Sequence, residues 1–370
     1  MITKTPSRRA TSLRLATAAT AGLALFALAG CSSGTATTGS TAAADGDDVA
    51  VTLIIKTQGT SFFQEMADGA EAAADELGVE LTVAAGKVDG DEDTQIQAIE
   101  NAISRGDQGI LITPNGPSVF DAIQKARDAG LYVIALDTVP DPADSVDITF
   151  ATDNFLAGQL VGQWTAEKLG GGDAVIALLD LFDDKVLTVD YDRDQGFLDG
   201  MGIDVADPTV NGDEAPTGSY TGGKGGTYTI VGNLATQGTE EGGRTAAETL
   251  LSKNPDINVI YGINEPASYG GYQALEAAGK TEGLITVSID GSCDGAQYVE
   301  DGILQATAQQ YPLKMAELGV QAIYDLVTTG TAPQPEDGED FFNTGVQLIT
   351  NDPMPGVPSI DVQEGLEVCF

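Results

Sequence analysis

The residues that could do chemistry are polar side chains that each follow directly after an apolar, strand-like run. They are Thr113, Asn115, Asp137, Thr138, Asn264, Glu265 and Asp290, with Thr60 and the adjacent pair Phe62 and Phe63 after the first run. In open α/β sheets, ligands bind at the carboxyl ends of the strands. Amides and carboxylates share hydrogen bonds with hydroxyl groups, and aromatic rings cover apolar C–H surfaces. Together these residues are typical of a neutral-sugar site, although each polar residue alone is more often a helix cap.

The residue types that the chain lacks narrow the possible chemistry. The sequence contains no histidine, which excludes Ser–His–Asp and Cys–His catalytic arrangements and histidine metal ligands. Pairs of carboxylates carry little information, because 56 acidic residues place many of them together by chance. We therefore expect a protein that is not an enzyme and that uses neither a metal nor a cofactor.

A glycine-rich stretch over residues 218–225 nearly matches a phosphate-binding loop. However, Gly225 replaces the hydroxyl residue that would bind magnesium, and no apolar strand precedes the glycines. We interpret residues 218–227 as a surface loop.

Acidic residues also occur at the spacing of a calcium-binding loop, namely Asp89, Asp91, Asp93 and Glu100. Thr94 occupies the position that requires glycine in such a loop. The stretch is better interpreted as the acidic, capped start of a helix over 93–105.

Strand-like runs alternate with amphipathic helical stretches along the chain. The expected strands are 51–55, 80–84, 109–112, 132–136, 148–151, 174–179, 228–231, 259–261, 285–289 and 305–308. The expected helices include 63–77, 93–105, 119–129, 157–169, 239–253, 268–278 and 313–328. This alternation predicts an α/β fold with parallel sheets covered on both faces. The length favours two domains with a boundary near residues 152–154.

The N-terminal residues predict export and membrane attachment. Residues 1–31 combine basic residues, an apolar run and the sequence Leu-Ala-Gly-Cys, which resembles a bacterial lipobox with Cys31 as the lipid-attachment residue. Residues 32–48 are rich in Ser, Thr, Gly and Ala and predict a flexible tether. Removing the four basic residues of the signal changes the formal charge from −39 to −43. Such an acidic chain excludes nucleic acid as a partner.

Short stretches spread along the chain carry a resemblance to a known family. They are TQGTSFFQEMADGAEAAADELG (57–78), GILITP (109–114), VIALDT (133–138), ATDN (151–154), RDQGF (193–197), INEPA (263–267), SIDG (288–291) and QQYPLKMAELG (309–319). In this order and spacing they resemble the periplasmic sugar-binding proteins of ABC importers, in the ribose- and galactose-binding cluster. The resemblance implies a type I periplasmic binding fold, with two doubly wound parallel-sheet domains joined by a three-strand hinge.

For the first domain, the resemblance implies a wall of the sugar site. Phe62 and Phe63 would stack on the sugar ring, and Thr60 stands where a ribose binder typically has asparagine. Lys56 and Thr113 would line the same wall. The resemblance assigns residues 49–152 and 311–338 to this domain, and residues 153–310 and 339–370 to the second.

The remaining site residues follow from the same resemblance. Asp137 would accept hydrogen bonds from hydroxyl groups, and Arg193 would donate to ring or hydroxyl oxygens. The second domain and the hinge would complete the site with Asn264, Asp290 and Gln310. Thr138 stands where many pentose and hexose binders have arginine, which removes one charged donor.

The resemblance also implies partners. The stretches VIALDT, VDYDRDQGF, INEPA and QQYPLKMAELG look most like the fructose-binding branch, with ribose, mannose, galactose and inositol left open. The protein is expected to be a monomer, lipid-anchored outside the cell, that delivers its sugar to an ABC transporter permease. A sensory receptor that presents a sugar or signalling molecule to a chemoreceptor or kinase is the alternative. Cys293 and Cys369 could form a disulfide in an exported protein.

Overall fold

The computed structural model describes residues 49–336 and 339–370, which belong to one compact unit. The expected signal peptide, Cys31 and the tether lie outside the described residues. Within the described part of the chain, none of the helices combines the length and the apolar composition that crossing a membrane requires.

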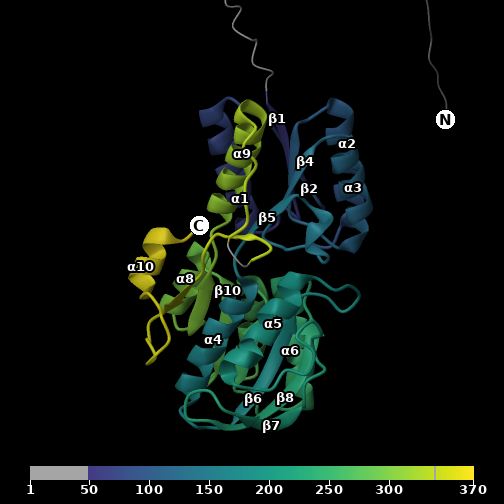
Figure 1. The fold of residues 1–370 in the computed structure, drawn as a ribbon. Coiled ribbons are helices and arrows are strands. Elements are labelled where there is room, and N and C mark those ends of the chain that lie inside the picture. The colour runs from purple at the N-terminus through teal and green to yellow at the C-terminus, as the bar shows by residue number, and fades with distance from the viewer. Residues whose placement is uncertain (1–48, 337–338) are drawn as a thin grey trace, which may run out of the picture. The chain divides into compact units, whose positions relative to one another are not determined.

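The N-terminal half builds a six-stranded sheet with the order β12-β5-β4-β3-β1-β2 (Figure 1). All of its strands are parallel: β1 (Ala50–Ile55), β2 (Glu80–Ala85), β3 (Gly109–Ile112), β4 (Tyr132–Leu136), β5 (Ile148–Ala151) and β12 (Phe342–Asn343). Because β1 is buried along almost its whole length, apolar side chains leave both of its faces, and helices cover each face. We call this sheet and its helices the first lobe.

Alternate residues of β1 divide the core of the first lobe into two layers. Leu53 and Ile55 pack with α1 (Ser61–Leu77) and α9 (Pro312–Thr329). Ile54 packs with α2 (Glu92–Arg105) and α3 (Phe120–Asp128) on the other face. Short 3₁₀ helices at Pro117–Val119 and Ala143–Ser145 complete the connections. The first lobe is therefore doubly wound.

The second lobe is built on a seven-stranded sheet with the order β13-β11-β10-β9-β6-β8-β7. Its parallel strands are β6 (Ala174–Asp180), β8 (Gly226–Ala235), β9 (Val259–Gly262), β10 (Ile285–Asp290) and β11 (Ala306–Gln309). The antiparallel strands β7 (Thr217–Tyr220) and β13 (Gln347–Thr350) form its two edges. Helices α4 (Asn154–Leu169) and α5 (Thr188–Met201) cover one face, and α6 (Glu240–Lys253) and α7 (Glu265–Ala277) cover the other.

The expected α/β fold of two doubly wound lobes is confirmed, but two local expectations need correction. The expected surface loop over 218–227 is confined to residues 221–225, because its two ends belong to the antiparallel strands β7 and β8, in which threonine and tyrosine supply the strand propensity. The C-terminal residues add the edge strand β13 and the helix α10 (Val362–Val368). Phe342 and Asn343 pair with β5, so the first sheet extends beyond the expected boundary at residue 338.

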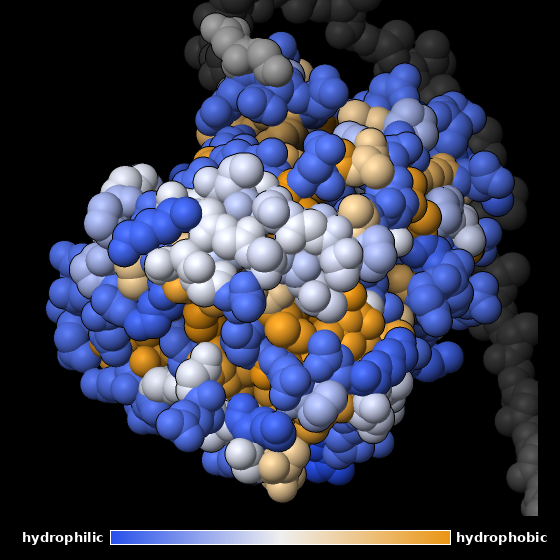
Figure 2. Space-filling view, turned by 90° about the horizontal axis from the view of Figure 1, so that it is seen from below, coloured by the Kyte–Doolittle hydropathy of each residue, from blue (hydrophilic) through white to orange (hydrophobic). Residues whose placement is uncertain are grey.

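The surface seen from below is hydrophilic around its rim, and a pale area of intermediate hydropathy lies in the centre beside exposed hydrophobic atoms (Figure 2). The strands β7 and β8 lie at this lower end in Figure 1, and their sequence is rich in Thr, Gly and Tyr. The hydrophilic surface agrees with the strongly acidic composition, which favours solubility.

Four glycines allow α4 and α5 to pack at unusually close range. A β-carbon at Gly158 would lie 2.1 Å from the main-chain oxygen of Arg193, and one at Gly162 would lie 2.1 Å from that of Phe197. Gly196 and Gly200 make the same kind of approach from α5 to the backbone of α4. This packing fixes the start of α5, and with it Arg193, against the first turns of α4.

Candidate functional site

A cavity of about 540 Å³ lies where the carboxyl ends of the strands of both lobes meet. The first lobe contributes the residues after β1, β2 and β4, and the second lobe contributes those after β6, β8, β9 and β10. Nine of the eleven sugar-site residues expected from the sequence line it: Lys56, Thr60, Phe62, Phe63, Asp137, Arg193, Asn264, Asp290 and Gln310. Strand ends that are far apart in the sequence therefore converge on one site.

Thr113 and Thr138 are fully buried and are not among the residues that line the cavity. The hydroxyl of Thr138 donates to Oδ2 of Asp137 at 3.0 Å, so it supports a site residue instead of facing the cavity. The hydroxyl of Thr113 donates to the carbonyl of Ile54 at 3.4 Å, and its own carbonyl accepts from Gln95 at 2.8 Å. The structure thus uses both side chains within the first lobe and places neither of them on the cavity wall.

Arg193 connects the two lobes at the base of the cavity. Its Nε donates to Oδ1 of Asn154 at 2.7 Å, and an Nη donates to the carbonyl of Ile263 at 3.1 Å. Its second Nη lies 3.4 Å from Oδ1 of Asp137 in the first lobe. Only 4% of Arg193 is exposed, so this ion pair is screened little by water. The guanidinium is held in one orientation with its charge at the cavity.

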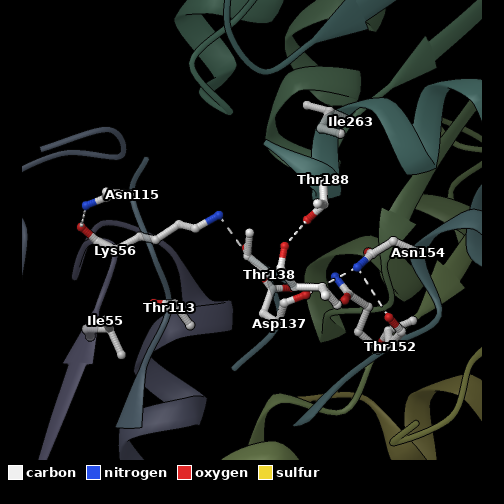
Figure 3. Close-up of polar contacts among 12 residues, drawn as sticks. Ile55, Lys56, Thr113, Asn115, Asp137, Thr138, Thr152, Asn154, Thr188 and Ile263 are labelled. Carbon is white, nitrogen blue, oxygen red and sulfur yellow. Dashed lines mark hydrogen bonds and ion pairs between the residues drawn. The ribbon is translucent and has the colours of Figure 1, made fainter. Parts of the chain in front are cut away.

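Asp137 gathers contacts from both lobes (Figure 3). Besides Arg193, it faces the Nζ of Lys56 at 3.8 Å, and its carbonyl accepts from Nδ2 of Asn154 at 3.2 Å. Its φ of 64° lies in the left-handed region, which aspartate tolerates better than most residues. This conformation directs the chain after β4 into the site rather than into a helix.

Asp290 and Gln310 form the corresponding polar pair of the second lobe. The Nε2 of Gln310 donates to Oδ1 of Asp290 at 3.0 Å, and the main-chain N–H of Gln310 donates to the carbonyl of Asp290 at 2.7 Å. Oε1 of Gln310 is buried without a hydrogen-bond partner in the described part of the chain. An acceptor in this position is available for a ligand hydroxyl.

Glu265 is a buried residue that supports the Asp290 loop. Its carboxylate accepts from the main-chain N–H of Gly291 at 2.9 Å, from the N–H of Ser292 at 3.1 Å and from the hydroxyl of Thr307 at 2.7 Å, and also from the hydroxyl of Ser292. Burial, with a smaller contribution from the nearby Asp290, raises the pKa of Glu265 to about 8 against the opposing effect of its hydrogen bonds. Burial likewise raises the pKa of Asp290 to about 7, although Arg193 opposes the shift.

Aromatic side chains line both walls of the cavity. Phe62 and Phe63 contact each other edge to face, with ring centroids 5.1 Å apart. On the second lobe, Tyr269 and Tyr298 stack with centroids 4.4 Å apart and an interplanar angle of 9°. Neither tyrosine was predicted from the sequence as a site residue. A possible signal was the position of Tyr269 one helical turn after Glu265 in the motif that follows β9.

Two expected site residues at helix starts differ in how they use their side chains. Asn264 is the N-cap of α7: its side-chain oxygen accepts from the N–H of Ala267 at 3.1 Å, and its Nδ2 donates to the carbonyl of Gly238 at 3.0 Å. Thr60 precedes α1 but makes no side-chain cap bond, and its buried hydroxyl lacks a partner among the described residues. Thr60 is thus the better placed of the two to bind a ligand.

The stretch with calcium-loop spacing is confirmed as the start of a helix. Asp91 caps α2 through Thr94, whose N–H donates to Oδ1 of Asp91 at 3.1 Å. Asp89 instead lines the cavity, and burial raises its pKa while Lys56 lowers it. Asp89 was not predicted from the sequence as a site residue. Within residues 49–336 and 339–370, no group of three or more potential metal-ligating Asp, Glu or Cys side chains could hold a metal ion.

These raised pKa values predict how stability depends on pH. The folded protein keeps protons on Glu265 and Asp290, whereas the unfolded chain releases them near pH 4–5. The contribution of these two protonated groups to the free energy of unfolding is therefore complete at acidic pH. It should be lost as the pH rises to about 8. We expect the free energy of unfolding, measured by urea denaturation from pH 5 to pH 8, to fall. Replacing Glu265 by Gln should flatten this slope by up to about 1.4 kcal/mol per pH unit.

The control for this measurement is Glu241→Gln, a substitution at an exposed position of α6. Its slope should match that of the wild type. An unchanged slope in Glu265→Gln would show that Glu265 is ionised in the folded protein throughout this range.

Cys293 and Cys369 are joined by a disulfide, with their Cα atoms 4.9 Å apart. The bond links the start of α8 (Cys293–Glu300) to the residue after α10. It fixes the tail to the loop that carries Asp290.

Comparisons with known proteins agree with this architecture. A family model for the periplasmic binding protein domain matches residues 50–332. The ribose import binding protein of Salmonella typhimurium is 27% identical over 285 residues, covering 77% of this chain and 86% of that protein. The D-ribose/D-allose-binding protein of Pseudomonas aeruginosa is 26% identical over 308 residues, covering 81% of this chain and 88% of that protein.

A solved structure is also similar over its full length. It is an ABC transporter solute binding protein from Agrobacterium vitis with bound D-fucose, 26% identical, with a TM-score of 0.70, covering 87% of this chain and 100% of that chain. These relatives are binding proteins and not enzymes. The family model matches most of the length of the chain, and the structure has two doubly wound lobes with a cavity between their strand ends. The chain therefore belongs to the periplasmic binding protein domain family.

Proposed function

We propose that this protein captures a neutral monosaccharide between its two lobes and delivers it to the permease of an ABC transporter. The observation that carries the proposal is the convergence of Asp137, Arg193 and Asp290 with the rings of Phe62 and Phe63 at one cavity. Carboxylate, guanidinium and amide groups can bind hydroxyls, while aromatic faces cover the C–H surface of a sugar ring. The sugar-binding relatives support the same class of ligand.

The charges at the cavity favour an uncharged ligand. Lys56, Lys87 and Arg193 line it together with six carboxylates: Asp89, Asp137, Glu240, Glu265, Asp290 and Asp294. Because burial raises the pKa of Glu265 to about 8 and that of Asp290 to about 7, these two groups are largely or partly protonated near neutral pH, and the remaining carboxylates nearly balance the three cations, so a charged solute gains no net attraction. A neutral polyol would only exchange water hydrogen bonds for those of the site.

The best candidate among the sugars is D-fructose, with ribose, mannose, galactose and inositol as alternatives. The choice of fructose rests on the stretches of the sequence that resemble the fructose-binding branch. Thr138 also differs from the arginine of many pentose and hexose binders and provides no charged donor, which argues against ribose. D-allose joins the candidates because a relative is a D-ribose/D-allose-binding protein.

Ligand binding should favour closure of the lobes, because only a closed form makes both sets of contacts. The hinges would lie near Thr152, Gln310 and Asn343, where the chain passes between the two sheets. The first lobe would then comprise residues 49–152 and about 311–343. A permease that contacts both lobes would distinguish the closed form from the open one.

A sugar panel tests the function. Thermal unfolding of residues 50–370, with D-fructose, D-ribose, D-allose, D-mannose, D-galactose or myo-inositol, should show stabilisation by at least one sugar. A ligand at 100 times its Kd adds about 2.7 kcal/mol. D-galacturonate, an anionic relative of galactose, serves as the control and should give no shift. A chain that responds to none of these sugars would contradict the proposal, whereas a response to a sugar other than fructose would correct only the specificity.

Membrane attachment through a lipid on Cys31 is a separate part of the proposal, supported by the lipobox-like sequence. Cell fractionation would test it: wild-type protein should remain with the membrane, and a Cys31→Ala variant should not. The alternative role as a sensory receptor would be favoured if deleting the gene abolished a response to the sugar but left its uptake intact.

A further inference from the structure

The segment Cys369–Phe370 connects the two walls of the cavity, although neither residue lines it. The segment follows α10, which packs on α8 of the second lobe. The disulfide joins Cys369 to Cys293, and the N–H of Cys293 donates to the main-chain oxygen of Phe370 at 3.0 Å. In addition, Nε2 of Gln309 donates to the carbonyl of Val368 at 2.6 Å. One covalent bond and two hydrogen bonds thus fix the segment to the second lobe.

The ring of Phe370 packs on the first lobe. Its centroid lies 5.6 Å from that of Phe62 at an interplanar angle of 78°, an edge-to-face contact. It also joins the buried cluster that contains Phe62, Phe63 and the residues of α1 and α9. Since Phe62 makes a second edge-to-face contact with Phe63, three rings in a row lead from the disulfide to the cavity.

The other end of the disulfide lies next to the polar wall of the site. Cys293 is three residues after Asp290, and Ser292 between them lines the cavity and caps α8. Glu265 holds this loop through the main-chain N–H groups of Gly291 and Ser292. The disulfide and the ring of Phe370 therefore join the Asp290 loop of the second lobe to Phe62 of the first.

We propose that the disulfide-held segment Cys369–Phe370 positions the aromatic wall of the cavity against the Asp290 loop, and so sets how tightly the ligand is held. The proposal rests on the proposed function, because it takes the ligand to be a sugar that contacts Phe62 and Phe63. Phe370 is a positioning residue, since it touches Phe62 and not the cavity. Without its ring or the disulfide, Phe62 gains conformational freedom that the ligand must remove on binding, which weakens affinity.

Two readouts test the proposal, one of which needs no ligand. Hydrogen–deuterium exchange of the ligand-free protein should show faster exchange in peptides that cover the first turns of α1 in Phe370→Ala and in the double variant Cys293→Ser/Cys369→Ser. Calorimetry should show about three- to tenfold weaker affinity for D-fructose, or for the sugar that gives the largest shift in the panel. Phe370→Tyr, which keeps the ring, should restore both values.

Combining Phe370→Ala with the two serine substitutions should weaken binding less than the product of the separate effects, because both act through one ring. Since Cys293 is exposed, treatment of the wild type with a dithiol reductant should reproduce the serine variant. Mass spectrometry of the intact protein confirms the disulfide before reduction.

Phe342→Ala is the matched control. Phe342 makes a similar edge-to-face contact with Phe150, at 5.4 Å and 90°, and belongs to the same cluster of the first lobe. It should lower stability without changing exchange in α1 or sugar affinity.

Unchanged exchange in the Phe370→Ala and serine variants, a change in only one of the two readouts, or an equal change in Phe342→Ala would overturn the proposal. If the wild type binds none of the panel sugars, the proposed function fails, and the exchange experiment alone decides whether the segment positions α1.

Discussion

Replacing Asp290 by Ala is expected to lower sugar affinity by at least about 100-fold, which corresponds to about 3 kcal/mol. The carboxylate is 9% exposed, lines the cavity and accepts from Nε2 of Gln310 at 3.0 Å. Its loss removes an acceptor for ligand hydroxyls and leaves the amide of Gln310 and the charge of Arg193 without this partner. Calorimetry with the panel sugar that stabilises the wild type measures the loss.

A matched control for this experiment is Asp256→Ala, an exposed aspartate of the same lobe. Its affinity should equal that of the wild type. The fold of the Asp290→Ala protein is checked by urea denaturation, since a variant that unfolds would also fail to bind. If Asp290→Ala binds the sugar as well as the wild type does, Asp290 does not belong to the site.

The second large effect is expected for Arg193→Met, which should lose about 3–5 kcal/mol of stability together with sugar binding. The guanidinium is buried and is bonded to Asn154, Ile263 and Asp137. Its removal leaves the carboxylate of Asp137, 3% exposed, with only the more distant Lys56 Nζ at 3.8 Å as a counter-ion. Urea denaturation gives the change in unfolding free energy.

Two further variants make this experiment specific. Arg244→Met removes an arginine that is 59% exposed and paired with Glu248 on one helix, so it should change stability by less than about 1 kcal/mol. Arg193→Lys should recover little, because an ammonium cannot reproduce the planar fork that reaches three partners. Full recovery by lysine would show that the charge matters and the geometry does not.

The buried charges and hydrogen bonds around the cavity hold its polar groups in fixed orientations. Arg193 and Lys56 hold Asp137 at the boundary of the lobes, and Glu265 holds the Asp290 loop from below. Each polar group is thus oriented before a ligand arrives, which lowers the entropic cost of binding.

Much of this protein follows from the sequence alone, because the signals are local. The short apolar runs at 51–55 and 109–112, rich in β-branched residues, favour buried parallel strands, and a polar residue after such a strand lies at the edge where ligands bind. This reasoning, with the family resemblance, predicted the doubly wound fold and the cavity residues Phe62, Phe63, Asp137, Arg193 and Asp290. The absence of histidine from the sequence is by itself enough to exclude Ser–His–Asp and Cys–His catalytic arrangements.

Tertiary structure decided what depends on contacts between distant residues. The sequence cannot show that Thr138 turns to Asp137 while Asp89 faces the cavity, because both are polar residues after strands. Nor can it show that Tyr269 stacks on Tyr298, or that Phe370 reaches Phe62 across 308 positions of the chain. The periodicity of a strand specifies which of its residues are buried. The direction of a loop side chain instead depends on which other residues the tertiary packing places next to it.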